Sequence, residues 1–395
     1  MTELTTVPLH MRRAGFDPDP ALQALRDDEG VRRVTTPLGV DAWLVTRYED
    51  VRAVLGDSER FIIGRHGLVQ NPAAPPLSPE ELAELRAGNL LAFDPPEHTR
   101  LRRMLTGEFT VRRMRRLEPR IEQIVEDHLD AMEAAGSPAD LVSDFALPIP
   151  SLVICELLGV PYEDRGGFQE RTAKILDTSV PIAERLALQQ ESRAYWASLV
   201  ARIQAEPDDG LLGMLVREHG DDLTASELVG IGSLLLVAGH ETTSNMLGLG
   251  TLAMLRHPEQ LAQMLKEPDA AVEELLRWLT IVHSGTIKLT TEPVTVGGQE
   301  IGEGELVMCA LAAANRDPSF LADPDVLDFS RGAPGHLAFG HGVHHCLGAP
   351  LARMEMRIAF PALFRRFPGL REASTETHFR AYHVVYGLSS LPVAW

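Results

Sequence analysis

A glycine-rich stretch around one cysteine constrains this chain more than any other part of its sequence. Residues 339–348 read Phe-Gly-His-Gly-Val-His-His-Cys-Leu-Gly, which places three glycines close to Cys346. Because glycine has no β-carbon, the backbone there is open to a large flat ligand. Apolar spacing from Ala349 onward predicts a helix, so Cys346 lies just before or at a helix start. The unpaired N–H groups and the dipole of such a start favour a thiolate, which is a ligand for iron.

Two simpler interpretations of Cys346 stay open on these residues alone. A lone cysteine is most often a buried structural thiol. His341, His344 and Cys346 could also bind zinc, but zinc sites usually take ligands from two separated pairs, and no second pair with that spacing is present. The three glycines have no role in a zinc site. Other parts of the sequence have to decide between these interpretations.

Composition and charge narrow the class of protein. The 395 residues are 45% hydrophobic and 24% charged, which is ordinary for a soluble globular protein. Residues 1–13 have no signal-peptide character, and the longest apolar stretch, 229–239, is too short to span a bilayer. Cys155 and Cys309 have apolar surroundings and are expected to be packing residues rather than half of a disulfide framework. Without a signal peptide or a membrane span, we expect a cytoplasmic protein. A net charge of -19 repels nucleic acid and anionic membranes, so we expect neither as partner.

Helical patterns dominate the chain after residue 95. The apolar spacing predicts helices at 111–135, 225–256, 270–279 and 349–367. Residues 39–46 alternate as a strand does, residues 294–307 read as short strands joined by glycine turns, and residues 71–79 read as a proline-rich loop. The expected fold class is mainly α with small β-sheets, in one large domain over residues 1–395.

The decapeptide at 339–348 resembles the haem-binding loop of the cytochrome P450 family, and three further segments resemble that family in the right order. The resemblance runs from residue 93 to the C-terminus. It implies a haem-thiolate monooxygenase fold that binds haem b, which is iron protoporphyrin IX, with Cys346 as the axial iron ligand. In the same loop it implies cofactor contacts from Phe339, Gly340 and Gly348, and a propionate contact from His344.

A second motif lies in the apolar helical pattern near its middle, where Ala238, Gly239, Glu241 and Thr242 occur together. Glycine there costs about 1 kcal/mol relative to alanine, and the Thr242 hydroxyl can bond the carbonyl four residues back, which opens a groove. A helix-packing glycine beside a polar pair is the simpler interpretation. By resemblance, Ala238 and Gly239 make room for dioxygen, Thr242 positions a hydrogen bond to it, and Glu241 helps relay protons.

Haem carries two propionates, which need cationic or donor side chains from several segments. His98 and Arg102 lie four residues apart and would share one helix face, and the resemblance makes both propionate ligands. Lys288 stands where the family usually has an arginine. It keeps the charge but lacks the two-pronged guanidinium, so we expect a weaker or differently aimed contact. His341 and His345 occupy variable positions and are expected to have no such role.

Two further segments resemble structural parts of the family. Glu274 and Arg277 lie three apart on a helix, and the resemblance implies that they lock the core with a second arginine, expected at Arg331. Residues 314–318 are expected to be scaffold. None of these residues is assigned to chemistry.

An arginine-rich segment stands out against the acidic background of this chain. Residues 100–116 contain seven arginines and one acid, Glu108. Such a run is often only a solvated face. The resemblance adds a docking face for an acidic ferredoxin-type electron donor with its NAD(P)H-dependent reductase, and we expect docking contributions at Arg103, Arg112, Arg113 or Arg116.

Substrate identity is the least constrained part of the sequence. By resemblance the substrate regions are 61–90, 168–190, the helix before Ala238, 281–287 and 384–389, and their mixed composition fits a mostly apolar small molecule such as a macrolide, another polyketide or a terpenoid. Hydroxylation or epoxidation is the expected reaction. Oxidative coupling or desaturation on the same fold, and a non-catalytic haem sensor, are the alternatives.

Overall fold

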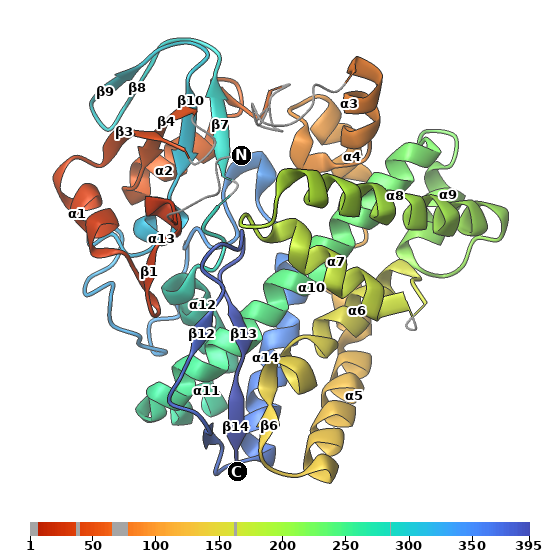
Figure 1. Ribbon diagram of the computed structural model, residues 1–395, viewed down its shortest axis with the longest axis vertical. Coiled ribbons are helices and arrows are strands. Elements are labelled where there is room, and N and C mark those ends of the chain that lie inside the picture. Colours follow the sequence, from red (N-terminus) through yellow and green to blue (C-terminus); the bar gives the residue numbers. More distant parts are fainter. Residues whose placement is uncertain (1–6, 37–39, 65–77, 162–163, 285) are drawn as a thin grey trace.

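The computed structural model describes residues 7–36, 40–64, 78–161, 164–284 and 286–395, and within these ranges helices make up most of the molecule (Figure 1). This confirms the expected fold class, mainly α with small sheets. The longer helices are α4 (Glu97–Thr106), α5 (Val111–Ala135), α6 (Pro148–Leu158), α7 (Arg165–Leu176), α8 (Ile182–Ala205), α10 (Ala225–Arg256), α12 (Pro268–Leu279) and α14 (Ala349–Arg366). The shorter ones are α1 (Pro20–Asp28), α2 (Tyr48–Gly56), α3 (Pro79–Arg86), α9 (Leu211–His219), α11 (Leu261–Lys266) and α13 (Leu311–Ala314).

The largest sheet has five strands in the order β3-β4-β10-β7-β5 and lies beside the helical part (Figure 1). Its strands are β3 (Val31–Thr35), β4 (Asp41–Val45), β10 (Leu306–Cys309), β7 (Ile287–Thr290) and β5 (Phe61–Ile62). β4 and β10 pair in parallel, and the other pairs are antiparallel. Lys288 on β7 pairs with Val307 on β10, so the sheet fixes the position of this lysine.

Four smaller sheets complete the described structure. They are formed by β1 (Arg13–Ala14) with β2 (Asp17–Pro18), by β8 (Val294–Val296) with β9 (Gln299–Ile301), by β12 (His378–Phe379) with β13 (Leu388–Ser390), and by β11 (Arg371–Glu372), β14 (Pro392–Ala394) and β6 (Ala139–Asp140).

Helix α10 passes through the middle of the molecule and organises its core (Figure 1). It begins with a capping box, in which Thr224 accepts from the backbone N–H of Glu227 and the Glu227 side chain accepts from that of Thr224. It packs on α6, α8 and α14. A β-carbon at Gly250 would lie 2.5 Å from Cζ of Phe360, so this glycine lets α10 and α14 approach closely.

Most boundaries predicted from the sequence are confirmed. Helices α5 and α10 have the predicted bounds, α12 begins two residues before the predicted start, and α14 ends one residue earlier. Of the predicted loop at 71–79, residues 71–77 lie outside the described residues. Its end was wrong, because Ser78 caps α3 and Pro79 begins it. No helix in the described ranges combines the length and apolar character needed to cross a bilayer.

Candidate functional site

The loop that presents Cys346 is held by its own backbone. The N–H of Cys346 donates to the carbonyl of Phe339 over 2.9 Å, after a short 3-10 helix at Gly342–His344. Gly340 and Gly342 have φ of +71° and +70°, where other residues are strained. A β-carbon at Gly342 would also lie 2.4 Å from the carbonyl oxygen of Leu55 on α2. These two glycines are therefore required by the loop itself.

The surroundings of Cys346 fit a ligand-binding sulfur. Its side chain is exposed, yet protein atoms surround it closely enough that burial raises the pKa of its thiol. The backbone N–H groups of Gly348 and Ala349 and the charge of Arg102 lower the pKa, but burial outweighs them. The preference for a thiolate stays a prediction, because these groups and burial act on the pKa of the free thiol in opposite directions, and a bound metal ion would favour the thiolate.

Open space lies beside two of the glycines that flank Cys346 in the sequence. A β-carbon at Gly348 would meet no atom within 4 Å, and one at Gly340 would meet only the carbonyl oxygen of His344, at 3.9 Å. The expectation that the glycines leave the backbone open therefore holds for Gly340 and Gly348 but not for Gly342, which packs against α2. A flat ligand could approach the loop on this side.

Four nitrogen-bearing side chains converge near Cys346, and they come from three separate segments. His98 and Arg102 lie on α4, Lys288 on β7, and His344 on the cysteine loop. The rings of His98 and His344 lie 4.3 Å apart between centroids, and none of their ring nitrogens has a hydrogen-bond partner among the described residues. His98 and Lys288 are almost fully buried.

The electrostatics of this cluster call for an anion. Burial lowers the pKa of Lys288 and of Arg102. It also takes the pKa of His344 to about 3, with further lowering by Lys288, His98 and Arg102. Buried donors without acceptors are costly, and mutually repelling cations more so. A ligand with carboxylates would give all four residues an acceptor, so the cluster fits haem propionates.

The middle of α10 has one open face. Ala238 is exposed and Thr242 half-buried, whereas His240 and Glu241 between them are buried. Residues four apart lie on one side of a helix, so Ala238 and Thr242 face the same space. The Thr242 hydroxyl donates to the carbonyl of Ala238 over 2.8 Å, which is the bond predicted from the sequence.

Gly239 does not face that space. A β-carbon there would lie 2.7 Å from Cδ1 of Ile154, so the glycine is needed where α10 packs on α6. This contact favours the simpler interpretation, a helix-packing glycine. Its assignment to the cofactor site stays a prediction.

Glu241 makes contacts that sequence reasoning missed. Its Oε1 accepts a hydrogen bond from Nη1 of Arg380 over 2.7 Å and lies 3.3 Å from Nε2 of His383. Both partners belong to the segment between β12 and β13, about 140 residues further along the chain. No motif in the sequence links Glu241 to that segment.

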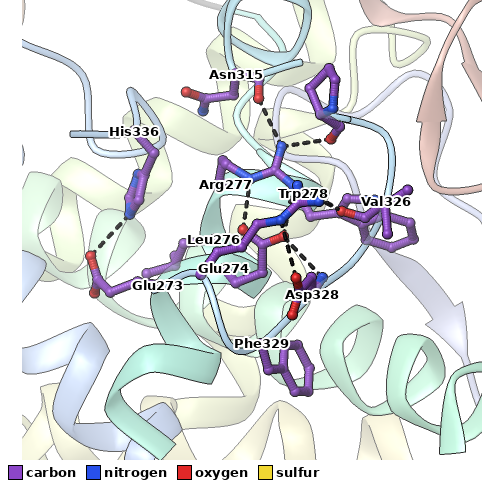
Figure 2. Close-up of polar contacts among 12 residues, drawn as sticks. Glu273, Glu274, Leu276, Arg277, Trp278, Asn315, Val326, Asp328, Phe329 and His336 are labelled. Atoms are coloured by element: carbon purple, nitrogen blue, oxygen red, sulfur yellow. Dashed lines mark hydrogen bonds and ion pairs between the residues drawn. The ribbon is translucent and has the colours of Figure 1, made fainter. Parts of the chain in front are cut away.

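A charged side chain packs on the ring of Phe339, the first residue of the cysteine loop (residues 339–348). The Arg353 guanidinium lies 4.6 Å from the Phe339 ring centroid and pairs with Glu273. Glu273 also lies 3.1 Å from Nε2 of His336, as Figure 2 shows. Burial alone would raise the pKa of Glu273, but Arg353 and His336 lower it to about 2. Phe339 is therefore held in place by a charged contact on its face.

The Glu274–Arg277 pair is structural, as expected, but the residue that completes the lock is not the expected Arg331 (Figure 2). Both side chains are fully buried, with Nε of Arg277 2.7 Å from Oε2 of Glu274. Glu274 also accepts from the backbone N–H of Asp328 over 3.1 Å. The assignment of Arg331 to the lock was wrong, because Arg331 pairs with Asp328 instead.

The arginine-rich segment divides into paired and unpaired members. Arg100 pairs with Glu97 and Glu227, and Arg113 pairs with Glu108. Four other arginines are exposed and pair with no carboxylate among the described residues, namely Arg103, Arg112, Arg115 and Arg116.

Comparisons with known proteins agree with this geometry. The family model described as Cytochrome P450 matches residues 184–377. Cytochrome P450 FAS1 of Rhodococcoides fascians is 47% identical over 399 residues, covering 100% of each chain. This chain belongs to the cytochrome P450 family.

Two further relatives of this cytochrome P450 have informative names. Mycinamicin IV hydroxylase/epoxidase of Micromonospora griseorubida is 42% identical over 94% of each chain. The solved structure of P450 StaH, from glycopeptide antibiotic A47934 biosynthesis, matches with a TM-score of 0.87 and 46% identity over 99% of this chain and 100% of that one. As a member of the family, the protein is a haem-dependent monooxygenase that acts on a small organic molecule with electrons from a redox partner.

Proposed function

We propose that this cytochrome P450 hydroxylates or epoxidises a mostly apolar natural product, such as a macrolide, another polyketide or a terpenoid. The name of one relative supports this class, since it is a hydroxylase/epoxidase of mycinamicin IV, while the solved structure from the biosynthesis of a glycopeptide antibiotic supports only a natural product in general. The functional unit is the whole chain, residues 1–395, in the cytoplasm. None of the three cysteines forms a disulfide, as is usual in a reducing compartment.

The observation that carries the proposal is the cluster of four donor side chains near Cys346, of which two are almost fully buried and two half-buried. His98, Arg102, Lys288 and His344 would hold the propionates of haem b, and Cys346 would bind its iron. When bound, haem with a thiolate ligand supplies the activation of dioxygen. Phe339, Gly340 and Gly348 would border the cofactor in the loop.

Two residues of α10 would hold and deliver protons. The Thr242 hydroxyl, which is tied to the carbonyl of Ala238, lies on the open face and can hold a proton or a water molecule there. Glu241, next in sequence, is the acid that would renew protons from solvent. Organised delivery favours product over release of hydrogen peroxide.

The electron donor would be a ferredoxin-type protein that receives electrons from an NAD(P)H-dependent reductase. The four unpaired arginines on α4 and α5 support this, because opposite charge steers an acidic partner. Arg113 contributes less than we expected from the sequence, since Glu108 neutralises its charge.

A visible spectrum tests the proposal. The purified protein is loaded with haem, reduced and exposed to carbon monoxide, and a thiolate-ligated haem gives a characteristic long-wavelength Soret band. A folded protein that binds haem without this band would remove Cys346 as the ligand. Spin-state shifts in the same instrument then identify which small molecules bind, and product analysis separates oxygen insertion from oxidative coupling or desaturation.

A further inference from the structure

The carboxylate of Glu241 is held by one oxygen only. Oε1 accepts from Nη1 of Arg380 over 2.7 Å and lies 3.3 Å from Nε2 of His383. Nε2 of His240 has no hydrogen-bond partner among the described residues and lies 3.8 Å from Oε2, too far for a hydrogen bond. Glu241 is 3% exposed, so its orientation depends on these few contacts. Arg380 therefore holds Oε1, whereas the contact of Oε2 with His240 is longer than a hydrogen bond.

Arg380 is the charged partner in this group. Burial lowers the pKa of His383, and Arg380 lowers it further. Burial also lowers the pKa of His240, whose Nδ1 lies 2.7 Å from the carbonyl of Leu236. Both rings are therefore neutral near pH 7. The positive charge that faces Glu241 comes from the guanidinium of Arg380.

Arg380 is itself held by a segment that is fixed at several points. Its Nη2 lies 2.5 Å from Nε2 of His383, and Nδ1 of His383 lies 3.0 Å from the carbonyl of Val385. The N–H of Val384 donates to the carbonyl of Leu176 at the end of α7 over 3.0 Å. These hydrogen bonds fix the segment that carries Arg380, and with it the position of the guanidinium beside Glu241.

We propose that Arg380 is a positioning residue, which holds Glu241 through Oε1 so that Oε2 is aimed for proton exchange. The inference rests on the proposed function, because it gives Glu241 a part in proton delivery. A proton arrives at Oε2 from the solvent side and leaves from Oε2 toward the open face of α10. Arg380 stays protonated and hydrogen-bonded throughout, and no electrons move through it. Without Arg380 the carboxylate turns freely, and delivery becomes slow.

Five variants test this in the haem-loaded protein. They are Glu241→Gln, Arg380→Gln, the double variant, Arg380→Lys and the control Arg120→Gln, which removes an arginine from the exposed pair with Glu156. The probe is 7-ethoxycoumarin, with NADPH, a plant-type ferredoxin and its reductase. Product and hydrogen peroxide per NADPH, kcat, KM, the solvent deuterium isotope effect and the carbon monoxide spectrum are measured for each.

We expect Arg380→Gln to keep the long-wavelength band and the KM, while kcat falls by about tenfold or more, since a positioned proton donor contributes roughly 10²- to 10⁴-fold. The share of peroxide and the solvent isotope effect rise together. Arg380→Lys restores part of kcat because it keeps the charge, and Arg120→Gln behaves as the unchanged protein. The decisive result is the double variant, which should equal Glu241→Gln alone.

Other results overturn the inference. Effects of Glu241→Gln and Arg380→Gln that multiply in the double variant would mean that Arg380 acts elsewhere. A change in KM alone would make Arg380 a substrate contact. If Glu241→Gln leaves coupling unchanged in a protein with the long-wavelength band, the inference fails and the proposed monooxygenase function stands. A missing band in the unchanged protein refutes the proposed function first.

Discussion

The imidazole rings of His98 and His344 lie 4.3 Å apart at an interplanar angle of 58°, and their four nitrogens point at no acceptor among the described residues. Two neighbouring rings without partners are unfavourable unless a ligand supplies acceptors to both. The pair joins α4 to the cysteine loop. A bound anion would therefore connect two segments that are far apart in the sequence.

Lys288 should matter for cofactor retention, although it replaces the usual arginine. We expect Lys288→Ala to lower the fraction of haem kept during gel filtration, because a buried charge-assisted bond of about 1.5–3 kcal/mol is lost. Lys288→Arg should retain haem. Lys174→Ala, which removes an exposed lysine paired with Glu170, is the control. Equal retention by Lys288→Ala and the unchanged protein would show that Lys288 is not a propionate ligand.

Stability should depend on pH differently with and without haem. The pKa of His344 is about 3 in the fold, against 6.5 normally, so between these values only the unfolded chain binds the proton. The free energy of unfolding therefore falls on acidification from pH 7 to 5, by up to about 2 kcal/mol from this residue. Propionates would raise the pKa and reduce this loss. Thermal unfolding of the haem-free and haem-bound forms at pH 7 and pH 5 measures this loss of stability.

A second histidine provides the control for that measurement. Burial takes the pKa of His283 to about 3 as well, and its Nε2 lies 2.6 Å from the carbonyl of His383 rather than near the propionate cluster. His283→Gln should make both forms less sensitive to acid. If haem leaves the acid sensitivity of the unchanged protein the same, His344 does not meet an anion.

Thr242→Ala should uncouple electron use from product formation. NADPH oxidation should continue, while product from 7-ethoxycoumarin falls by about tenfold or more and hydrogen peroxide rises. Thr251→Ala is a matched control, because Thr251 makes the same bond to the carbonyl four residues back, over 2.8 Å, at a fully buried position. A ratio of peroxide to product that does not move in Thr242→Ala would refute the role.

The exposed arginines should set the rate of electron transfer. We expect the rate constant for reduction by a ferredoxin to fall by about tenfold between low salt and about 1 M salt. At about 1 M the Debye length is only roughly 3 Å, so charges on the two proteins no longer attract each other over longer distances. Replacing Arg112, Arg115 and Arg116 with glutamine should lower the low-salt rate and flatten the salt dependence. Arg120→Gln, whose charge is already paired, should change little. Stopped-flow reduction that ignores ionic strength would contradict the docking face.

Arg277→Ala should be strongly destabilising. It leaves the carboxylate of Glu274 fully buried without its cation, which costs about 3–5 kcal/mol. Arg331→Ala removes a partly exposed pair with Asp328 and should cost about 1 kcal/mol or less. Urea unfolding compares the two. If the two variants lose similar amounts of unfolding free energy, Arg331 does belong to the core lock.

Local signals explain what could be predicted from the sequence. The bounds of α5 and α10 were predicted from apolar periodicity, and the structure shows that Thr110 and Thr224 cap their N-termini, so both signals are properties of neighbouring residues. The bond from Thr242 to Ala238 spans one helical turn and was predicted for the same reason. Cys346 was identifiable because its glycines are adjacent in the chain.

Contacts between distant segments could not be predicted. Gly239 was visible as a weak point of its helix, but only the packing of α6 shows which side it faces. The spacing of Glu274 and Arg277 says nothing about the loop that completes the lock, so Arg331 was chosen wrongly. Arg380 meets Glu241 through the tertiary fold alone.

The parallel pairing of β4 with β10 has a consequence for how the protein is made. The ribosome releases residues 41–45 early, but their central partner at 306–309 emerges only after most of the chain has been made. Until then β4 has β3 alone beside it, and a two-stranded ribbon is marginal in water. Lys288 lies on the next strand of that sheet. The part of the propionate-binding cluster that Lys288 supplies is therefore put in place late in translation.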